Sequence, residues 1–481
     1  MIRSTLPRFL TLASAAALLS ACAVGPRAPD ADLPQLASGA FVGAQSAAVS
    51  PDAARDDWWR LYNDPVLDGL ITQAFAENNE LEAADANLRA VRASLSEARA
   101  GRFPTTSLGA AAQRSRGSAA TAQGTALPAG QDLPEIDTYD VGLDASYEID
   151  LFGRVGSSIR AARADADAQE AARDTVRISV AAETARAYAD ACSANAQIAV
   201  AERTIALQQN SADLTQRLLD GGAGTGLDTA RSQSALASSR ATLPGLRAQR
   251  DGALFRLSTL TGRTPAEASE AARSCARPPQ LSQPIPVGDG AALLARRPDV
   301  RRAERQLAAA AARVNVATAS LYPTISLGGS FGSTALDEGG LGDDENFRFS
   351  FGPLISWSFP NILVARARIA QTGALTEAAL ATFDQTVLAA LEETETALSN
   401  YANELDRRAA LTVARDRAAD AARLSRLRFD AGADAFLAVL DAERTLAQAE
   451  QSLAQSDALV TTYQITLFKA LAGGWGEAAS A

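Results

Sequence analysis

The sequence predicts a mainly α-helical protein with a transmembrane β part, built as a tandem duplication of one long unit. A helix-to-strand junction occurs twice, at Phe103-Pro104 and at Tyr322-Pro323, each time after an alanine-rich run at helical spacing. Apolar-polar alternation lies between each junction and the next helix, from Tyr139 to Ile149 and from Phe347 to Phe359, and a long helical run without proline or internal glycine comes next. The repetition of this order favours one duplicated architecture over several unrelated domains.

The composition excludes most enzyme chemistry. Among the 481 residues there is no histidine, which removes Ser-His-Asp and Cys-His catalysis and leaves a zinc or copper site only cysteine and carboxylate ligands. The formal net charge of −11 argues against binding nucleic acid through a broad basic surface. We therefore expect no catalytic site, no metal site, no cofactor and no nucleic-acid partner.

The N-terminus reads as a lipoprotein signal peptide over residues 1–21. Arg3 and Arg8 supply a charged start, Phe9 to Leu19 is apolar but too short to span a bilayer, and the run Leu19-Ser20-Ala21-Cys22 matches a lipoprotein cleavage box. Cys22 is then a lipidated first residue, and its covalent lipid is the one non-protein group that we expect. An ordinary secretory leader with an incidental Cys22 is the alternative.

Two cysteines remain in the mature chain. Cys192 and Cys275 could form a disulfide in an oxidising compartment. We favour the simpler interpretation that they are two small buried or unpaired residues.

The mature chain divides into an arm, two repeats and short connections. The first residues, up to about Asp52, are rich in proline, alanine and glycine and are a poor candidate for packed structure. Asn63 or Asp64 is expected to cap the first helix, which begins at Pro65. The expected segments are an extended arm at 22–56, a first repeat at 57–265, a linker at 266–290, a second repeat at 291–475 and a tail at 476–481.

Each repeat contains one predicted β-hairpin, within residues 103–150 and 322–359. The expected strands are residues 103–115 with 138–150, and 322–332 with 347–358. From Tyr139 to Ile149 every second residue is apolar, over a length close to the ~9 to 11 residues of a strand that crosses a bilayer. Strands of a soluble sandwich are the alternative. Because four strands leave two open edges in lipid, several chains must share one barrel, and three copies would give twelve strands.

Each hairpin is followed by a predicted helical hairpin, at residues 154–260 and 363–471. A glycine-rich turn interrupts each of them, at Gly221 to Gly226 and at Ala431 to Asp434. Small side chains on the helix faces permit close packing, so each chain should contain two antiparallel helical hairpins.

Several motifs in this order resemble those of outer-membrane factors of tripartite efflux systems, the TolC-like family, and of its NodT-type lipoprotein branch. They are the Leu19 to Cys22 box, Trp59 to Pro65, Arg297-Pro298-Asp299-Val300 with Ala303-Glu304, Tyr322-Pro323, Leu440 to Arg444, and Lys469 to Trp475. The resemblance implies a homotrimer in the outer membrane of a Gram-negative bacterium, with a twelve-stranded β-barrel that continues into a helical tunnel, the α-barrel, in the periplasm.

The same resemblance implies a passive exit duct that carries drugs or other small toxic compounds. Its implied partners are a periplasmic adaptor, an inner-membrane pump of the resistance-nodulation-division type, and outer-membrane lipid. A duct for type I protein secretion or for metal-ion export is the second interpretation. A lipid-anchored scaffold without a pore is the third.

Candidate gate residues lie at the tip after the second long helix. Leu437, Asp441 and Arg444 fall on one helical face, and the resemblance implies that such tips close the tunnel. It also implies a link between Arg428 and Asp228, while Phe429 lacks the aromatic hydroxyl that the family places there. A solvated pair of Asp441 with Arg444 is the alternative. The glycine-rich turns are the expected adaptor contacts, at Gly221, Gly222, Gly224, Gly226, Gly432 and Ala433.

Overall fold

The computed structural model describes residues 24–26, 29, 39–117, 134–281, 283–358 and 362–474. The predicted leader, Cys22 and the tail 476–481 lie outside the described residues. The chain forms two compact units, which we describe separately as the strand unit (Met1–Asp30, Arg89–Asp167 and Glu304–Ala381) and the helical unit (Ala31–Leu88, Ala168–Ala303 and Thr382–Ala481). Each unit contains matching parts of both predicted repeats.

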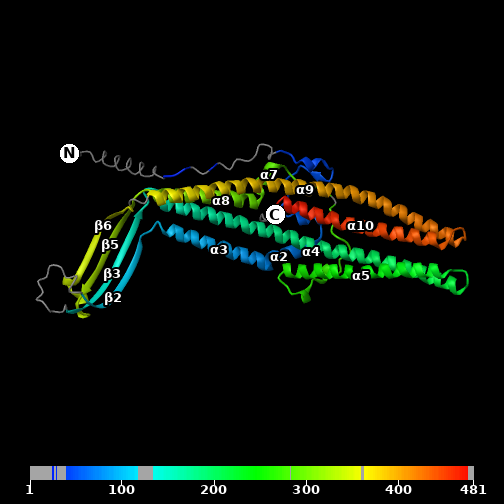
Figure 1. The fold of residues 1–481 in the computed structure, drawn as a ribbon, viewed down its shortest axis with the longest axis horizontal. Coiled ribbons are helices and arrows are strands. Elements are labelled where there is room, and N and C mark those ends of the chain that lie inside the picture. Colours follow the sequence, from blue (N-terminus) through cyan, green and yellow to red (C-terminus); the bar gives the residue numbers. More distant parts are fainter. Residues whose placement is uncertain are drawn as a thin grey trace, which may run out of the picture. The chain divides into compact units, whose positions relative to one another are not determined.

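The strand unit contains one antiparallel sheet of four strands, in the order β2-β3-β5-β6 (Figure 1). The prediction of two hairpins is confirmed, with ends that differ by a few residues. The strands were expected to begin at Phe103 and Tyr322, but these residues lie in turns that follow the two preceding helices, so both first strands begin after the proline. The strands are β2 (Thr105–Arg116), β3 (Glu135–Ile149), β5 (Thr324–Ala335) and β6 (Phe347–Ser356).

The register of the sheet separates an apolar face from a polar one. Residues directly opposite one another in a sheet point to the same face. One row across all four strands consists of Leu108, Leu143, Phe331 and Phe349, and all four side chains are exposed. The adjacent row consists of Ser107, Asp144, Ser330 and Ser350, in which the last two hydroxyls lie 2.7 Å apart. The predicted alternation therefore runs coherently through the whole sheet.

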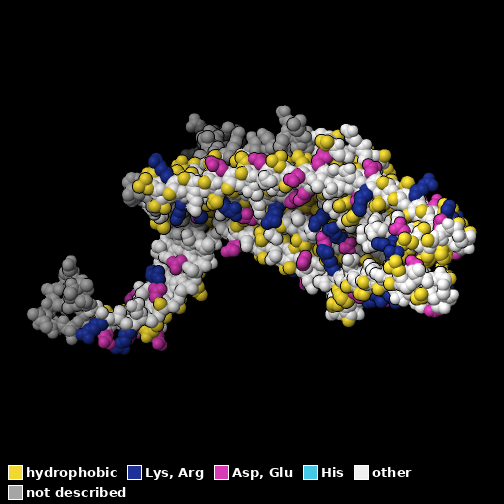
Figure 2. Space-filling model, turned by 45° about the vertical axis from the view of Figure 1, so that its right-hand side comes forward, with side chains coloured by type: hydrophobic (Ala, Val, Ile, Leu, Met, Phe, Trp, Pro, Cys, Tyr) yellow, Lys and Arg dark blue, Asp and Glu magenta, His cyan; other side chains and the backbone are white. Residues whose placement is uncertain are grey.

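Charged side chains gather toward one end of the strands (Figure 2). Arg114 lies 2.9 Å from the carboxylate of Glu135, and Arg348 binds Asp140 at 2.7 Å. These ion pairs lie beside a sheet surface that otherwise exposes large apolar side chains. An exposed apolar face of this extent is typical of a surface covered by another medium or molecule.

Two helical hairpins account for most of the remaining chain. Each consists of a very long helix and a returning helix of 35 residues, with pairing contacts between Arg240 and Gln209 in the first hairpin and between Arg408 and Asp457 in the second (Figure 1). The helices are α4 (Arg154–Asp220) with α5 (Gly226–Leu260), and α9 (Ile362–Asp430) with α10 (Phe436–Ala470).

The two hairpin turns have the same backbone structure, as a duplication predicts. Gly222 and Gly432 adopt φ angles of +77° and +70°, the left-handed conformation that ends a helix. The N–H of Ala223 donates to the carbonyl of Leu218, and that of Ala433 to Arg428, both at 2.8 Å. Glycine is therefore favoured at both positions because the turn requires a positive φ angle.

Shorter helices precede the sheet and the long hairpins. Asp64 caps the first helix by accepting from the N–H of Val66 at 2.9 Å, whereas Asn63 takes a left-handed conformation. The helices are α2 (Pro65–Glu77), α3 (Asn79–Ala100), α6 (Glu270–Arg273), α7 (Gly290–Arg296) and α8 (Pro298–Ala319). In the part of the chain that is described, none of the helices has an apolar stretch long enough to cross a bilayer.

The core of the helical unit forms around the N-terminal aromatic residues. Trp58 is fully buried and stacks on Phe468 with ring centroids 4.8 Å apart, so it anchors the segment before α2 to the end of α10. The segment before Trp58 is also bound to the helical unit, because β1 (Val49–Ser50) pairs in parallel with β4 (Ile285–Pro286). The N–H groups of Val42 and Gly43 also donate to the carboxylate of Glu395, at 2.7 and 2.9 Å.

Cys192 and Cys275 form a disulfide, so the favoured interpretation of two unpaired cysteines is wrong. Cys192 is buried on α4, and the two Cα atoms are 5.2 Å apart. Asn195 holds the linker in place by donating to the carbonyls of Arg273 and Cys275, at 2.9 and 2.8 Å. The packing of the linker on α4 brings the two sulfur atoms together.

Candidate functional site

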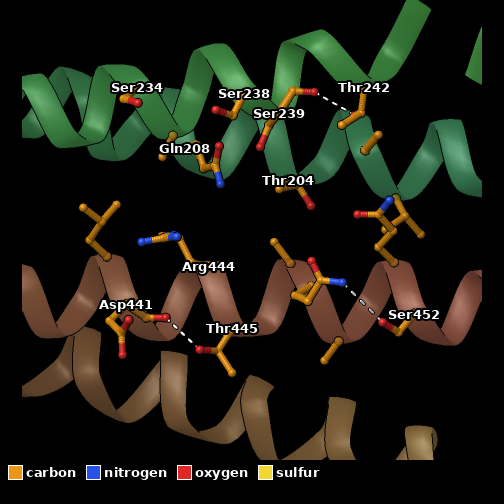
Figure 3. A pocket seen from close by; sticks show the side chains of 18 of the residues that line it. Thr204, Gln208, Ser234, Ser238, Ser239, Thr242, Asp441, Arg444, Thr445 and Ser452 are labelled. Carbon is orange, nitrogen blue, oxygen red and sulfur yellow. Dashed lines mark hydrogen bonds between the residues drawn. The ribbon is translucent and has the colours of Figure 1, made fainter. Parts of the chain in front are cut away.

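The three candidate gate residues line one groove at the start of α10. Leu437, Asp441 and Arg444 are exposed, and together with residues of α4 and α5 they border a groove of 1170 Å³. The opposite wall is mainly hydroxyl and amide side chains: Thr204, Gln208, Ser234, Ser238, Ser239 and Thr242. In Figure 3 the side chain of Arg444 extends from α10 toward this wall. The groove is therefore polar on one side and carries the candidate gate face on the other.

Asp441 and Arg444 do not form an ion pair with each other among the described residues. The backbone carbonyl of Asp441 accepts from the Thr445 hydroxyl at 2.9 Å, which is an ordinary contact within a helix (Figure 3). Neither charged side chain has an oppositely charged partner within 4.0 Å in the described part of the chain. Both charges therefore face the groove in a form available to another molecule or another copy.

Arg428 and Asp228 are not brought together in one chain. The guanidinium of Arg428 binds Asp434 at 2.6 Å, and this hydrogen bond lowers the pKa of the Asp434 carboxyl. Asp228 instead accepts from the Thr225 hydroxyl at 2.6 Å, at the N-terminus of α5. Both contacts are local, so each residue is engaged within its own hairpin turn.

Phe429 packs where a hydroxyl-bearing side chain was expected from the family. Its ring lies edge-on to Phe436, with centroids 5.5 Å apart. Phe436 belongs to a small apolar cluster at the tip, together with Val439 and Leu440. An aromatic contact within the second hairpin thus takes the place of a polar one.

The glycine-rich turns present mostly bare backbone to the surface. Gly221, Gly222, Gly226, Gly432 and Ala433 are exposed. Gly224 differs, because a Cβ atom there would meet the backbone nitrogen of Leu219 at 2.9 Å. The turn itself thus requires Gly224, while the other positions are open to approach from outside.

The structure adds a buried polar link that sequence reasoning missed. Glu443 on α10 accepts from the Ser211 hydroxyl on α4 at 2.8 Å, and Arg426 on α9 lies 3.7 Å from its other oxygen. Burial raises the pKa of the Glu443 carboxyl. In the sequence, Glu443 only resembles one more charge on an amphipathic helix, and no local signal marks its partner.

No group of side chains suited to a metal ion occurs among the described residues. The candidate site is a polar groove with exposed charges, and the buried link between Ser211 and Glu443 lies beside it. Such an arrangement can control passage by charge and by side-chain position.

Comparison with known proteins assigns the chain to a family. The profile of the family "outer membrane efflux protein" matches residues 70–263 and 291–473. The pyoverdine export outer membrane protein OpmQ of Pseudomonas aeruginosa is 32% identical over 97% of each chain. The antibiotic efflux pump outer membrane protein ArpC of Pseudomonas putida is 30% identical, over 97% of this chain and 96% of its own.

A solved structure has the same fold. The outer-membrane channel OprN superposes with a TM-score of 0.87 at 34% identity, covering 94% of this chain and 100% of its own. The four-stranded antiparallel sheet and the two long helical hairpins agree with this likeness. The chain belongs to the outer membrane efflux protein family and is an outer-membrane efflux channel of the TolC-like fold.

Proposed function

We propose that three copies of this chain form the passive exit duct of a tripartite pump, gated at the helix tips by Leu437, Asp441 and Arg444. The main support for a duct formed by several copies is the four-stranded sheet. It has one apolar face, and β2 and β6 are its two edges within the described residues. Unpaired backbone groups in lipid cost several kcal/mol each, so the edges must pair with neighbouring copies in a closed barrel.

The gate assignment rests on the shared groove of the three residues. Around a threefold axis, Leu437 would form an apolar constriction, and Asp441 and Arg444 would form two charged rings beside it. Within one chain their charges have no partner among the described residues. Any contact between Arg428 and Asp228 is assigned to neighbouring copies, since each has another partner in its own turn.

The proposed partners follow from the exposed helical-hairpin turns and from the lipidation motif at Cys22. Exposed backbone at Gly221, Gly222, Gly226, Gly432 and Ala433 suits the close approach of a periplasmic adaptor, and the half-buried Gly224 shapes the first of these turns. An inner-membrane pump of the resistance-nodulation-division type would supply the driving force. A lipid on Cys22 would fasten the arm to the outer membrane. Export of small compounds is the proposed activity, because relatives are named for pyoverdine export and antibiotic efflux.

Single-channel conductance in planar bilayers tests the gate. The double variant Leu437→Ala with Asp441→Ala should form trimeric channels of larger conductance than the unaltered protein. Leu424→Ala with Asp420→Ala is a matched control, since these exposed residues of α9 have the same spacing and do not line the groove. Equal conductance in both variants and the unaltered protein would reject the gate, and a monomer without conductance would reject the duct.

A further inference from the structure

Glu443 occupies the same helical turn as the proposed gate residues Asp441 and Arg444 but lies on the side of α10 away from Asp441. At about 100° per residue, Asp441 and Arg444 lie roughly 60° apart around α10, whereas Glu443 lies about 160° from Asp441 and about 100° from Arg444. The gate residues line the groove, and Glu443 contacts Ser211 on α4, the helix that also supplies Thr204 and Gln208 to the groove wall. A contact that fixes Glu443 therefore also fixes the rotation of the turn that carries the gate.

The contact of Glu443 is buried and directional. Its side chain is 14% exposed, and Ser211, which donates to it at 2.8 Å, is 1% exposed. A carboxylate in such a place remains charged only where hydrogen bonds or opposite charges compensate its lost hydration. The apolar cluster of Phe436, Val439 and Leu440 packs the neighbouring turns, but apolar contacts tolerate small rotations that a short hydrogen bond does not.

Arg426 plays a secondary part in this contact. Its guanidinium lies 3.7 Å from Glu443 and also 3.7 Å from Asp430, so two carboxylates share it. The Ser211 hydroxyl, by contrast, donates directly to the Glu443 carboxylate. The Ser211 bond is accordingly the specific tie between the first hairpin and the start of α10.

We propose that Glu443 is a positioning residue for the gate: through Ser211 it holds the gate-bearing turn of α10 against α4. This inference rests on the proposed gate function. Any opening movement that swings or rotates the tip of α10 away from α4 must break the link. Loss of the link then shifts the channel toward the open state without any change in the residues that face the groove.

The helix contains its own matched control. Ser456, also on α10, donates to the buried carboxylate of Glu404 on α9 and is 0% exposed. Ser211→Ala and Ser456→Ala each remove one buried hydroxyl from one carboxylate, and each carboxylate keeps an arginine neighbour. They differ in that only the Ser211 bond holds the turn with Asp441 and Arg444.

The experiment compares Ser211→Ala, Glu443→Ala, the double variant and Ser456→Ala by single-channel recording and thermal unfolding of the trimer. A hydrogen bond to a charged group should shift the ratio of open to closed channels about tenfold. We expect this shift in Ser211→Ala and Glu443→Ala, with no further shift in the double variant. Ser456→Ala should lower the unfolding temperature as Ser211→Ala does and leave conductance unchanged.

The outcomes separate this inference from the proposed function. If Leu437→Ala with Asp441→Ala opens the channel while Ser211→Ala and Glu443→Ala behave like the unaltered protein, the positioning role is wrong and the gate stands. If Ser456→Ala opens the channel as much as Ser211→Ala, general loosening of α10 explains both, and the positioning role is again wrong. If the gate variant itself has no effect, the proposed gate fails.

Discussion

Arg297 donates a hydrogen bond of 3.0 Å from Nη1 to the backbone carbonyl of Ala470, the last residue of α10. The last carbonyls of a helix lack partners within the helix, and a cation there also interacts favourably with the helix dipole. The same guanidinium binds Asp299 at 2.6 Å and Glu393 at 2.7 Å. One side chain thus joins the start of α8 to α9 and to the end of α10.

Replacement of Arg297 should strongly destabilise the helical unit. Its side chain is 8% exposed, and Arg297→Ala leaves two carboxylates and a helix end without their partner. The carboxylates of Asp299 and Glu393 are 35% and 60% exposed and can be solvated by water, so the expected cost is that of lost charged hydrogen bonds, about 1.5–3 kcal/mol. Arg297→Lys should recover only part of the loss, because an ammonium cannot reproduce the forked geometry. The measurement is the thermal unfolding temperature of the purified trimer.

The matched control for Arg297 is Arg302→Ala, which removes an exposed arginine from the same helix, α8. Exposed substitutions of this kind change stability by about 0.5 kcal/mol or less. Equal unfolding temperatures for the Arg297 and Arg302 variants would show that the buried contacts of Arg297 contribute nothing specific.

The disulfide should stabilise the linker against α4. It joins residues 83 apart in sequence. A cross-link over a loop of this length lowers the conformational entropy of the unfolded chain and thereby stabilises the folded protein by about 2–4 kcal/mol. Cys192→Ser with Cys275→Ser should therefore lower the unfolding temperature, and a reducing agent should lower that of the unaltered protein. The reducing agent should have no effect on the double serine variant. A reductant effect of equal size in that variant would refute the role of this disulfide.

Acidification should act on the gate through Glu443. Burial raises the pKa of its carboxyl, so Glu443 takes up a proton at a higher pH than an exposed glutamate does. The groups that face it are Ser211 on α4 and Arg426 on α9, with Asp430 sharing the arginine. Protonation removes the attraction to Arg426. We therefore expect the conductance of the unaltered protein to approach that of Glu443→Gln as the pH falls.

The sign for stability follows from the same shift. An acid whose pKa is raised on folding favours the folded state most below its ordinary pKa and loses that contribution as the pH rises through the raised value. On acidification from neutral pH, the unfolding temperature of the unaltered protein should therefore rise relative to that of Glu443→Gln. A constant difference between the two proteins across this range would contradict the assignment. Because the comparison is with Glu443→Gln, titration of other carboxyl groups cancels.

Much of this fold could be predicted from the sequence because its signals are local. The alternation from Tyr139 to Ile149 has the period of a strand, and residues 157–220 and 374–430 contain no proline or glycine before the two turns. The starts of the first strand in each repeat were missed by a few residues, since the residues before Pro104 and Pro323 form turns that follow the helices. The three candidate gate residues could be grouped because they stand on one face of one helix.

By itself, the sequence determined the duplicated order of helices and strands, the two faces of the sheet and the absence of histidine chemistry. The tertiary structure alone decided which distant side chains meet: Cys192 with Cys275, Arg428 with Asp434 rather than Asp228, and Ser211 with Glu443 across 232 residues. Periodicity reports which way a side chain points on its own helix. It carries no information on how two helices are rotated and shifted against each other, and that packing selects the partners.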